Sequence, residues 1–350
     1  MTQLLRILSI DGGGIRGILP GQIMVALEQK LQTKSGNANA RVADYFDLVA
    51  GTSTGGILTC LYLCPDDNNP ARPRFSASEA VDLYLKFGGT IFKNDLLNKF
   101  KTLDGVSEEK YPAAPMENIL KTYFKDIKLS QLLRPCLITS YDISARTTHF
   151  FTQHDAVQNP AYDYLLWETA RSTSAAPTYF EPALAHSLTG VTYPLVDGGV
   201  FANNPAMCAY AEARQQFKRL DGSKNVTAID MFMVSIGTGS TKKSYPYDKA
   251  KKWGELGWVE PIIDILMSGA SDTIDFQLKE IFDASDSNEN YIRISPEIGG
   301  ANSEMDDASA KNLQALKDAG TASAKKYDAE LERIADFLVK SNTVDAGTVA

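Results

Sequence analysis

The chain has few histidines and few cysteines for its length. Its 350 residues include three histidines and four cysteines. The cysteines are Cys60, Cys64, Cys136 and Cys208. Only Cys60 and Cys64 are close in sequence, and two further ligands at metal spacing are missing, so the pattern does not indicate a zinc site. We expect buried, reduced thiols in a reducing compartment, and neither a metal site nor a cofactor.

The sequence also lacks long apolar runs and an excess of positive charge. The longest apolar stretches, such as Ile57–Cys64, are far shorter than the ~20 residues that span a bilayer. The N-terminus lacks the basic start and long apolar stretch of a signal peptide. We therefore expect a cytoplasmic protein whose membrane contact is peripheral and transient. The net charge of −8 argues against a nucleic-acid partner, because phosphate backbones repel such a chain overall.

Apolar runs of strand length alternate with segments of helical periodicity. The predicted strands are Leu4–Ile10, Phe46–Ala50, Cys136–Tyr141, His149–Thr152, Tyr193–Val196 and Met231–Ile236. The predicted helices are Leu19–Leu31, Tyr162–Arg171, Pro205–Phe217, with Asn203 or Asn204 as N-cap, and Ala308–Val339, with a break near Gly320. The predicted loops are Pro65–Arg74, Asp221–Asn225 and Gly237–Pro261. Such alternation predicts an α/β fold with a mainly parallel sheet and helices on both faces. We expect one domain over residues 1–350, with its core at about residues 5–335.

The segment Gly51-Thr52-Ser53-Thr54-Gly55 has the G-x-S-x-G form, after a predicted strand and before a predicted helix. That context is the one a nucleophile elbow requires. The turn is tight, so Gly51 and Gly55 avoid clashes that a side chain would cause. Ser53 would then lie at a helix N-terminus, where developing negative charge is stabilised. A plain strand–helix turn of small residues is the alternative.

A second glycine-rich segment, Asp11-Gly12-Gly13-Gly14-Ile15-Arg16-Gly17, also connects a predicted strand to a predicted helix. Consecutive glycines leave backbone N–H groups unobstructed, so they can converge on an oxyanion. Arg16 would fix the loop or add positive charge. The spacing of Gly12, Gly14 and Gly17 also fits a dinucleotide-binding turn, for which Glu28 is the nearest acidic partner, although it lies in a predicted helix.

Asp197-Gly198-Gly199 follows the predicted strand Tyr193–Val196. A carboxylate at a strand end beside two glycines can approach another backbone closely, although a simple turn also explains this tripeptide. The positions of the histidines bear on its role, because His149, His154 and His186 all precede Asp197. An α/β-hydrolase triad places its histidine late in the chain. A carboxylate base for Ser53 is therefore favoured, with His186 as the alternative.

These three motifs, in this order, resemble the signature of the patatin-like phospholipase family. That signature is a D-G-G-G-x-R-G loop, a G-T-S-T-G elbow and a D-G-G or D-G-A motif. Further stretches similar to the family are residues 170–180, 203–205 and 305–309. The resemblance covers roughly residues 5–335.

The resemblance implies a three-layer α/β/α fold and a lipid acyl hydrolase that uses a Ser–Asp dyad. It assigns the nucleophile to Ser53 and the base to Asp197. It assigns the oxyanion hole to the backbone of Gly12, Gly13 and Gly14, supported by Arg16. The expected substrate is a phospholipid or another fatty-acyl ester. A storage or scaffold protein, or a nucleotide-binding protein, remains the alternative.

The region Thr241–Ala270 is a candidate lid or membrane-interface element. It carries five lysines, then Trp253 and Trp258, then the apolar run Ile262–Met267; the lysines are Lys242, Lys243, Lys249, Lys251 and Lys252. Lysines beside tryptophans suit an anionic lipid surface. A solvated loop before a core helix is the simpler interpretation.

Overall fold

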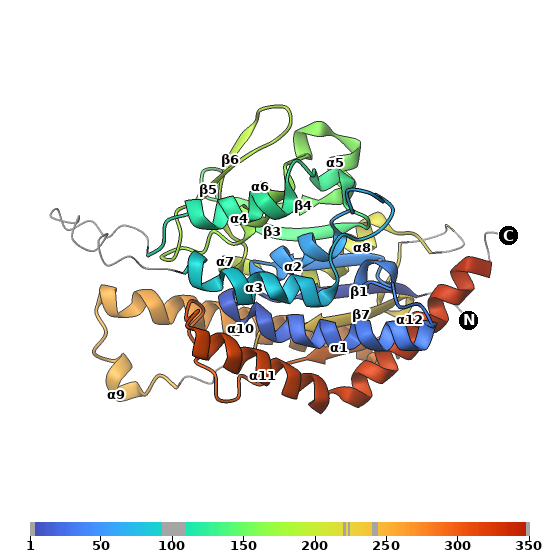
Figure 1. Ribbon diagram of the computed structural model, residues 1–350. Helices are drawn as coiled ribbons and strands as arrows, with labels where there is room; N and C mark the ends of the chain where they lie inside the picture. Colours follow the sequence, from blue (N-terminus) through green and yellow to red (C-terminus); the bar gives the residue numbers. More distant parts are fainter. Residues whose placement is uncertain (1–3, 93–109, 220–221, 223–224, 240–243, 348–350) are drawn as a thin grey trace.

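The computed structural model describes residues 4–92, 110–219, 222, 225–239 and 244–347 (Figure 1). Its centre is an eight-stranded sheet with the order β5-β6-β3-β2-β1-β7-β8, and β4 pairs with β3. The strands are β1 (Leu5–Ile10), β2 (Leu48–Thr52), β3 (Cys136–Asp142), β4 (Thr147–Thr152), β5 (Ala183–His186), β6 (Thr192–Asp197), β7 (Met231–Ile236) and β8 (Tyr291–Ile294). From β3 to β8 every neighbouring pair is parallel, whereas β4, β5 and β6 pair antiparallel.

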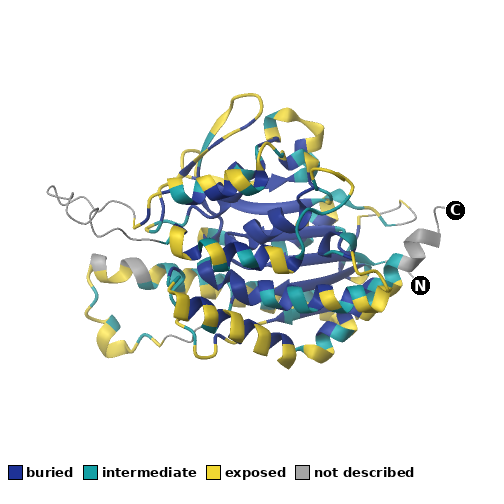
Figure 2. Ribbon diagram, in the orientation of Figure 1, coloured by how far each residue is buried: buried dark blue, intermediate teal, exposed yellow. Residues whose placement is uncertain are grey.

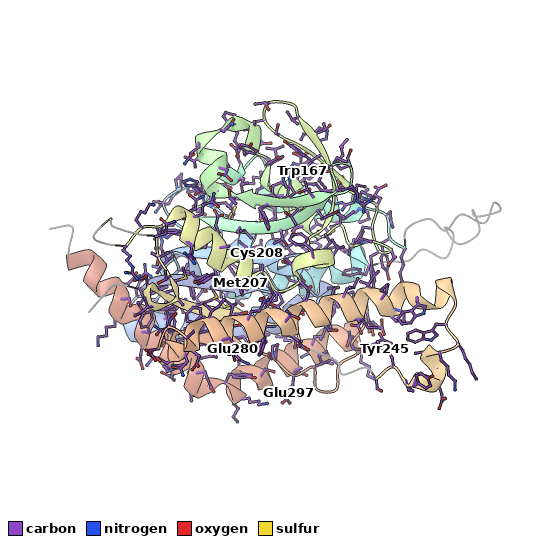
Figure 3. All side chains as sticks on the ribbon, turned by 180° about the vertical axis from the view of Figure 1, so that it is seen from behind. Trp167, Met207, Cys208, Tyr245, Glu280 and Glu297 are labelled. Carbon is purple, nitrogen blue, oxygen red and sulfur yellow. The ribbon has the colours of Figure 1, made fainter. Side chains whose placement is uncertain are left out.

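Helices cover both faces of the sheet. They are α1 (Ile18–Ser35), α2 (Thr54–Leu63), α3 (Ala77–Ile91), α4 (Ala114–Phe124), α5 (Gln153–Gln158), α6 (Leu166–Thr173), α7 (Gly199–Ala202), α8 (Ala206–Gln216), α9 (Tyr247–Ala250), α10 (Glu255–Asp283), α11 (Ala310–Lys326) and α12 (Asp328–Gly347). In Figure 1, α1, α3 and α11 lie in front of the sheet, and Figure 3 shows α10 on the opposite side. The predicted α/β architecture with a mainly parallel sheet is confirmed.

The side chains of the central strands alternate between two apolar cores. On β1, Leu8 packs into the core under α1 and α11, whereas its neighbour Ile7 packs into the core with Ala209 of α8 and Leu278 of α10. Strands buried on both faces need continuous apolar sequence, as is usual in parallel sheets. This explains why the strand predictions lie close to the observed bounds. Figure 2 shows the central strands in the colour of buried residues.

Three predictions of local structure were wrong. The C-terminal helical region breaks at Tyr327, not near Gly320. Gly320 lies inside α11, where an added Cβ would come within 2.8 Å of the Gln22 side chain, so its role is to let α11 approach α1 closely. Residues 162–165 are not part of α6, because Tyr164 bridges to Ser187 instead. Residues 237–261 are not one loop, since they contain α9 and the start of α10.

The cap of α8 also differs from the prediction. Pro205 occupies the N-cap position, while the Asn204 side-chain oxygen accepts a hydrogen bond from the Ala206 N–H at 3.0 Å.

All four cysteines are free thiols, and Cys208 is the only one of them that is partly exposed. Across the described ranges, no helix combines the length and apolar character needed to cross a membrane.

Candidate active site

Ser53 occupies a strained turn between β2 and α2. Its φ is 54° and its ψ is −121°, in a region that non-glycine residues rarely adopt. An added Cβ on Gly51 would lie 2.2 Å from the Gly55 oxygen, and one on Gly55 would lie 2.1 Å from the Ile10 oxygen. Only glycine fits at either position. The turn places Ser53 at the N-terminus of α2, as the sequence predicted.

The sheet brings Ser53 to Asp197 because two strands meet end to end. β4 occupies one edge of β3, so β2 and β6 share the other edge. The last residue of β2, Thr52, pairs with Thr139, and the last residue of β6, Asp197, pairs with the next residue, Ser140. β2 runs parallel to β3 and β6 runs antiparallel, so their carboxyl ends meet.

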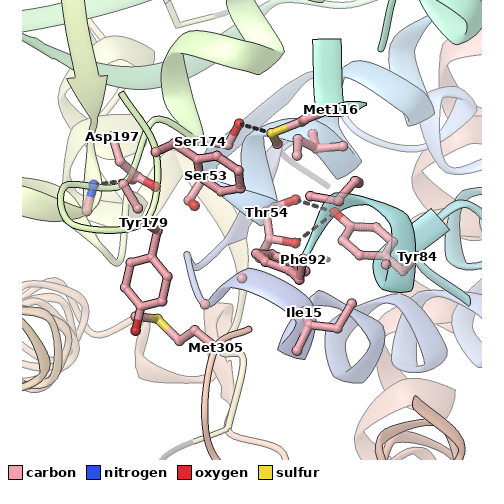
Figure 4. Close-up of a pocket in the computed structure, with 18 of the residues that line it drawn as sticks. Ile15, Ser53, Thr54, Tyr84, Phe92, Met116, Ser174, Tyr179, Asp197 and Met305 are labelled. Atoms are coloured by element: carbon pink, nitrogen blue, oxygen red, sulfur yellow. Dashed lines mark hydrogen bonds between the residues drawn. The ribbon is translucent and has the colours of Figure 1, made fainter. Parts of the chain in front are cut away.

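Asp197 is buried beside Ser53 (Figure 4). Its Oδ1 accepts a hydrogen bond from the Gly199 N–H at 2.7 Å. Burial raises the pKa of Asp197 to about 7, although the Ser53 hydroxyl and the Gly199 N–H favour the charged form. A carboxylate with such a pKa can accept a proton near neutral pH.

The glycine loop lies beside Ser53, but the N–H of Gly12 is already occupied. This N–H donates to the Asn203 carbonyl at 3.0 Å. Its partner is therefore a backbone carbonyl, whereas the sequence predicted that Gly12 would donate to an oxyanion. An added Cβ at Gly12 would lie 3.2 Å from the Ser53 Cβ, so the glycine is needed for close approach. Gly13 and Gly14 line the pocket next to Ser53, and Gly14 has a φ of 60°. The candidate oxyanion donors are therefore the N–H groups of these two residues.

Arg16 stabilises the glycine-rich loop through two hydrogen bonds to backbone carbonyls. Its Nε donates to the Gly13 carbonyl at 3.3 Å and its Nη1 to the Gly239 carbonyl at 3.2 Å. The guanidinium is buried, and burial lowers the pKa of Arg16. Two motif glycines also allow close contacts: an added Cβ on Gly17 would lie 2.0 Å from the Thr54 Oγ1, and one on Gly198 would lie 2.1 Å from the Thr139 Oγ1.

A buried ion pair at the base of the loop was not predicted from the sequence. Asp11 accepts two hydrogen bonds from Arg293 on β8, Nη1 to Oδ1 at 2.8 Å and Nη2 to Oδ2 at 2.5 Å. Arg293 Nη1 also donates to the Ser235 Oγ at 2.8 Å. The carboxylate holds the pKa of Arg293 above its usual range. Since Arg293 follows Asp11 by 282 positions, no local motif connects them.

Replacing Arg293 by methionine should destabilise the protein by about 3–5 kcal/mol, because it leaves the Asp11 carboxylate buried without its partner. Urea unfolding monitored by circular dichroism measures the change. The double variant Asp11→Asn, Arg293→Met removes both charges and should recover at least half of the loss. Equal stability of the Arg293→Met variant and the wild type would show that the ion pair is not structurally important.

An apolar pocket opens directly above Ser53 and Asp197. The space between its walls amounts to about 1080 Å³, which includes open solvent at the mouth. Its apolar walls come from α2, α3, α4 and α10 and from connecting segments; they include Ile57, Leu83, Ile91, Phe92, Met116, Ile119, Leu120, Phe180, Leu266 and Met267. Tyr84 also lines the pocket, and its hydroxyl donates to the Thr54 carbonyl at 3.0 Å (Figure 4). Among the residues that the structure describes, no lysine, arginine or histidine lines the pocket.

The residues required by the two alternative interpretations have other partners. Glu28 is buried on α1, and its carboxylate accepts hydrogen bonds from the N–H groups of Val42, at 3.2 Å, and Ala77, at 3.0 Å. It is therefore not available to a ribose hydroxyl. His186 lies on β5 with its Nδ1 2.8 Å from the Glu168 Oε1, and it does not line the pocket.

Comparison with known proteins identifies the class to which this fold and site belong. A sequence model described as patatin-like phospholipase matches residues 8–210. The chain belongs to the patatin-like phospholipase family. It is 34% identical to patatin group J-1 and 33% identical to patatin-11, both from Solanum tuberosum. Each of these alignments covers 97% of this chain and 90% of the relative.

Two solved structures are also similar. VipD from Legionella pneumophila aligns with a TM-score of 0.37 and 12% identity, over 97% of this chain and 67% of that one. Human GIVD cytosolic phospholipase A2, in complex with methyl gamma-linolenyl fluorophosphonate, aligns with a TM-score of 0.39 and 10% identity. That alignment covers 97% of this chain and 60% of the human chain.

Proposed function

We propose that the protein is a lipid acyl hydrolase in which Ser53 and Asp197 form the catalytic dyad. The observation that carries this proposal is the position of a strained serine beside a buried carboxylate of raised pKa, on the floor of an apolar pocket. Family membership supports the same activity, since the matching family is described by its phospholipase activity.

The first half-reaction forms an acyl-serine. Asp197 accepts the proton of the Ser53 hydroxyl while the Oγ attacks the ester carbonyl carbon. The N–H groups of Gly13 and Gly14, together with the N-terminus of α2, stabilise the negative charge on the carbonyl oxygen. When this intermediate collapses, the bond to the alcohol oxygen breaks and Asp197 returns the proton to the leaving alcohol.

The second half-reaction releases the fatty acid. A water molecule attacks the acyl-serine while Asp197 accepts its proton, and the same backbone donors stabilise the second oxyanion. The bond to the Ser53 Oγ then breaks, and the Oγ regains its proton from Asp197. The overall reaction converts one ester and one water molecule into one alcohol and one fatty acid.

The pocket favours recognition of the acyl chain over recognition of a charged head group. Its walls are almost entirely apolar, so an extended hydrocarbon chain gains free energy of about 25 cal/mol for each Å² removed from water. None of the described cationic side chains lines it, so a phosphate group would find no charged partner among them. We propose fatty-acyl esters as the substrate class, with phospholipids among them.

The test is fatty-acid release from phospholipid vesicles with calcium chelated. The wild type should release fatty acid, whereas Ser53→Ala and Asp197→Asn should release none above background. A soluble short-chain ester serves as a second substrate that does not require a lipid surface. A wild type that is inactive on both substrates would contradict the proposal.

Replacing Ile119 by tryptophan should shorten the acyl chain that the enzyme accepts. Ile119 lies on α4 and contributes to the pocket wall, so a larger side chain would fill part of the space. We expect the ratio of kcat/KM for a palmitoyl ester to that for a butyryl ester to fall at least about tenfold. Ile119→Val is the matched control and should leave the ratio within about twofold. An unchanged ratio in Ile119→Trp would contradict the assignment of the pocket to the acyl chain.

A further inference from the structure

The helix α10 exposes a row of large apolar side chains along one side. The row consists of Trp258, Ile262, Ile265, Leu266 and Phe276. Leu266 is 55% exposed and Phe276 is 65% exposed, whereas Leu278 and Phe282 of the same helix are buried in the core. Trp258 to Leu266 cover about 12 Å of the helix, and Phe276 lies about 15 Å further along it, at 1.5 Å per residue. Figure 3 shows this helix on the outside of the molecule, behind the sheet as seen in Figure 1.

The apolar row is continuous with the mouth of the pocket. Leu266 is both exposed and part of the pocket lining, and so is Val200 on the neighbouring helix α7. Beside Val200, the Phe201 ring contacts the Phe150 ring edge to face, with centroids 5.9 Å apart, and Phe150 is also exposed. We call the α10 row together with Val200 and Phe150 the α10 face. Through Leu266 and Val200, this face adjoins the pocket that Ser53 lines.

Aromatic and basic side chains lie at the N-terminal end of this face. Trp258 packs edge to face on Trp253, with ring centroids 4.9 Å apart. Next to them α9 and the following turn expose Lys249, Lys251 and Lys252. Lys251 pairs with Asp248 at 2.6 Å, but no described carboxylate pairs with Lys249 or Lys252. Aromatic rings and lysines beside an apolar helix face are typical of helices that lie in the surface of an anionic bilayer.

We propose that the α10 face docks on the surface of a bilayer that contains anionic lipids, with the pocket mouth turned toward the membrane. This proposal rests on the proposed function, in which the pocket takes up a fatty-acyl ester. After docking, that ester would pass from the bilayer into the pocket without crossing water. A second copy of the chain on this face would cover the mouth, whereas a fluid bilayer supplies what the pocket binds. For α9 and α10, this proposal takes the membrane-interface interpretation of residues 241–270 in preference to a solvated loop before a core helix. Lys242 and Lys243 lie outside the described residues.

Vesicle binding tests the docking separately from catalysis. The protein, in a Ser53→Ala background, is sedimented with vesicles of ether-linked phosphatidylcholine containing ether-linked phosphatidylglycerol, which carry no ester. The triple variant Ile262→Ser, Ile265→Ser, Phe276→Ser removes apolar side chains that do not line the pocket. The matched control is Leu184→Ser, Val191→Ser, which removes exposed apolar side chains from the β5–β6 hairpin. The pair Lys249→Glu, Lys252→Glu tests the role of charge.

We expect the triple variant to bind the vesicles at least tenfold more weakly than the parent, and the control to bind as the parent does. The lysine pair should bind severalfold more weakly, and its binding should lose most of its salt dependence. Brominated ether lipids should quench part of the tryptophan fluorescence, because Trp258 belongs to the α10 face and Trp253 packs on it. In the active background, the triple variant should hydrolyse a soluble ester at the wild-type rate but vesicle lipid much more slowly.

Three results would overturn the proposal. One is that the parent protein does not bind the vesicles, the second is that the triple variant and the control bind equally, and the third is that the parent is a dimer which the triple variant dissociates. Soluble-ester hydrolysis without vesicle binding would refute the docking alone. Vesicle binding without any esterase activity in the active background would refute the proposed function alone.

Discussion

An Asp197→Asn variant is expected to lose at least about 10³-fold in kcat/KM for ester hydrolysis and, at pH 8, to be more stable than the wild type. The loss follows from the proposed role of Asp197 as the only side-chain base for Ser53. The gain follows from its burial. The pKa of Asp197 is about 7 in the folded protein, against 3.8 as its ordinary value. The folded protein therefore holds this proton more tightly than the unfolded chain does.

The sign of the pH dependence follows from this difference. Below about pH 4 the carboxyl is protonated in both states and costs nothing. Between about pH 4 and pH 7 the unfolded chain loses the proton first, so stability falls as pH rises. The upper limit of this loss is about 4 kcal/mol, at 1.36 kcal/mol for each pKa unit. We expect the Asp197→Asn variant to recover roughly 1–3 kcal/mol at pH 8, because the amide also changes the hydrogen bonds to its neighbours.

Urea unfolding of wild type and Asp197→Asn at pH 8 and at pH 4.5 measures the stability difference, which should shrink at the lower pH. The activity of the wild type should rise with pH and level off above about pH 7, as Asp197 loses its proton. A variant that is less stable than the wild type at pH 8 would mean that the carboxylate is not destabilising there. A flat pH–rate profile from pH 5 to pH 8 would argue against Asp197 as the base.

Ser53→Ala should abolish hydrolysis, with a loss on the order of 10⁴-fold or more, while Ser53→Gly should be equally inactive but more stable. The physical reason is the backbone conformation at this position. Ser53 has a φ of 54°, and holding a non-glycine residue in such a region costs about 1–3 kcal/mol. Glycine removes most of this strain, and alanine retains it.

The comparison between the two variants is the informative one, because neither has the hydroxyl. We expect Ser53→Gly to unfold at a higher urea concentration than Ser53→Ala, by roughly 1 kcal/mol in free energy once the greater flexibility of glycine in the unfolded chain is subtracted. A fluorophosphonate probe should label the wild type at Ser53 and neither variant. Labelling of a variant, or a Ser53→Gly protein less stable than Ser53→Ala, would contradict the strained-nucleophile interpretation.

The sequence was informative wherever structure depends on neighbouring residues. Strands buried on both faces require continuous apolar runs, so the run Met231–Ile236 predicted β7 to the residue. The spacing of Gly51, Ser53 and Gly55 predicted a strained elbow, because the steric demand of that turn is local. Predictions from local sequence patterns failed where a residue is required by a contact with a segment far away in the chain. Gly320 looked like a helix break but is there for contact with α1.

The sequence by itself determined the α/β class of the fold, the family resemblance and the serine that would act as nucleophile, since each of these depends on short segments and their order. Only the tertiary structure decided how the site is assembled. The meeting of β2 and β6 on one edge of β3 brings Asp197 to Ser53. The Asn203 carbonyl occupies the N–H of Gly12, and Arg293 pairs with Asp11. These contacts join residues far apart in the chain, so no local sequence pattern encodes them.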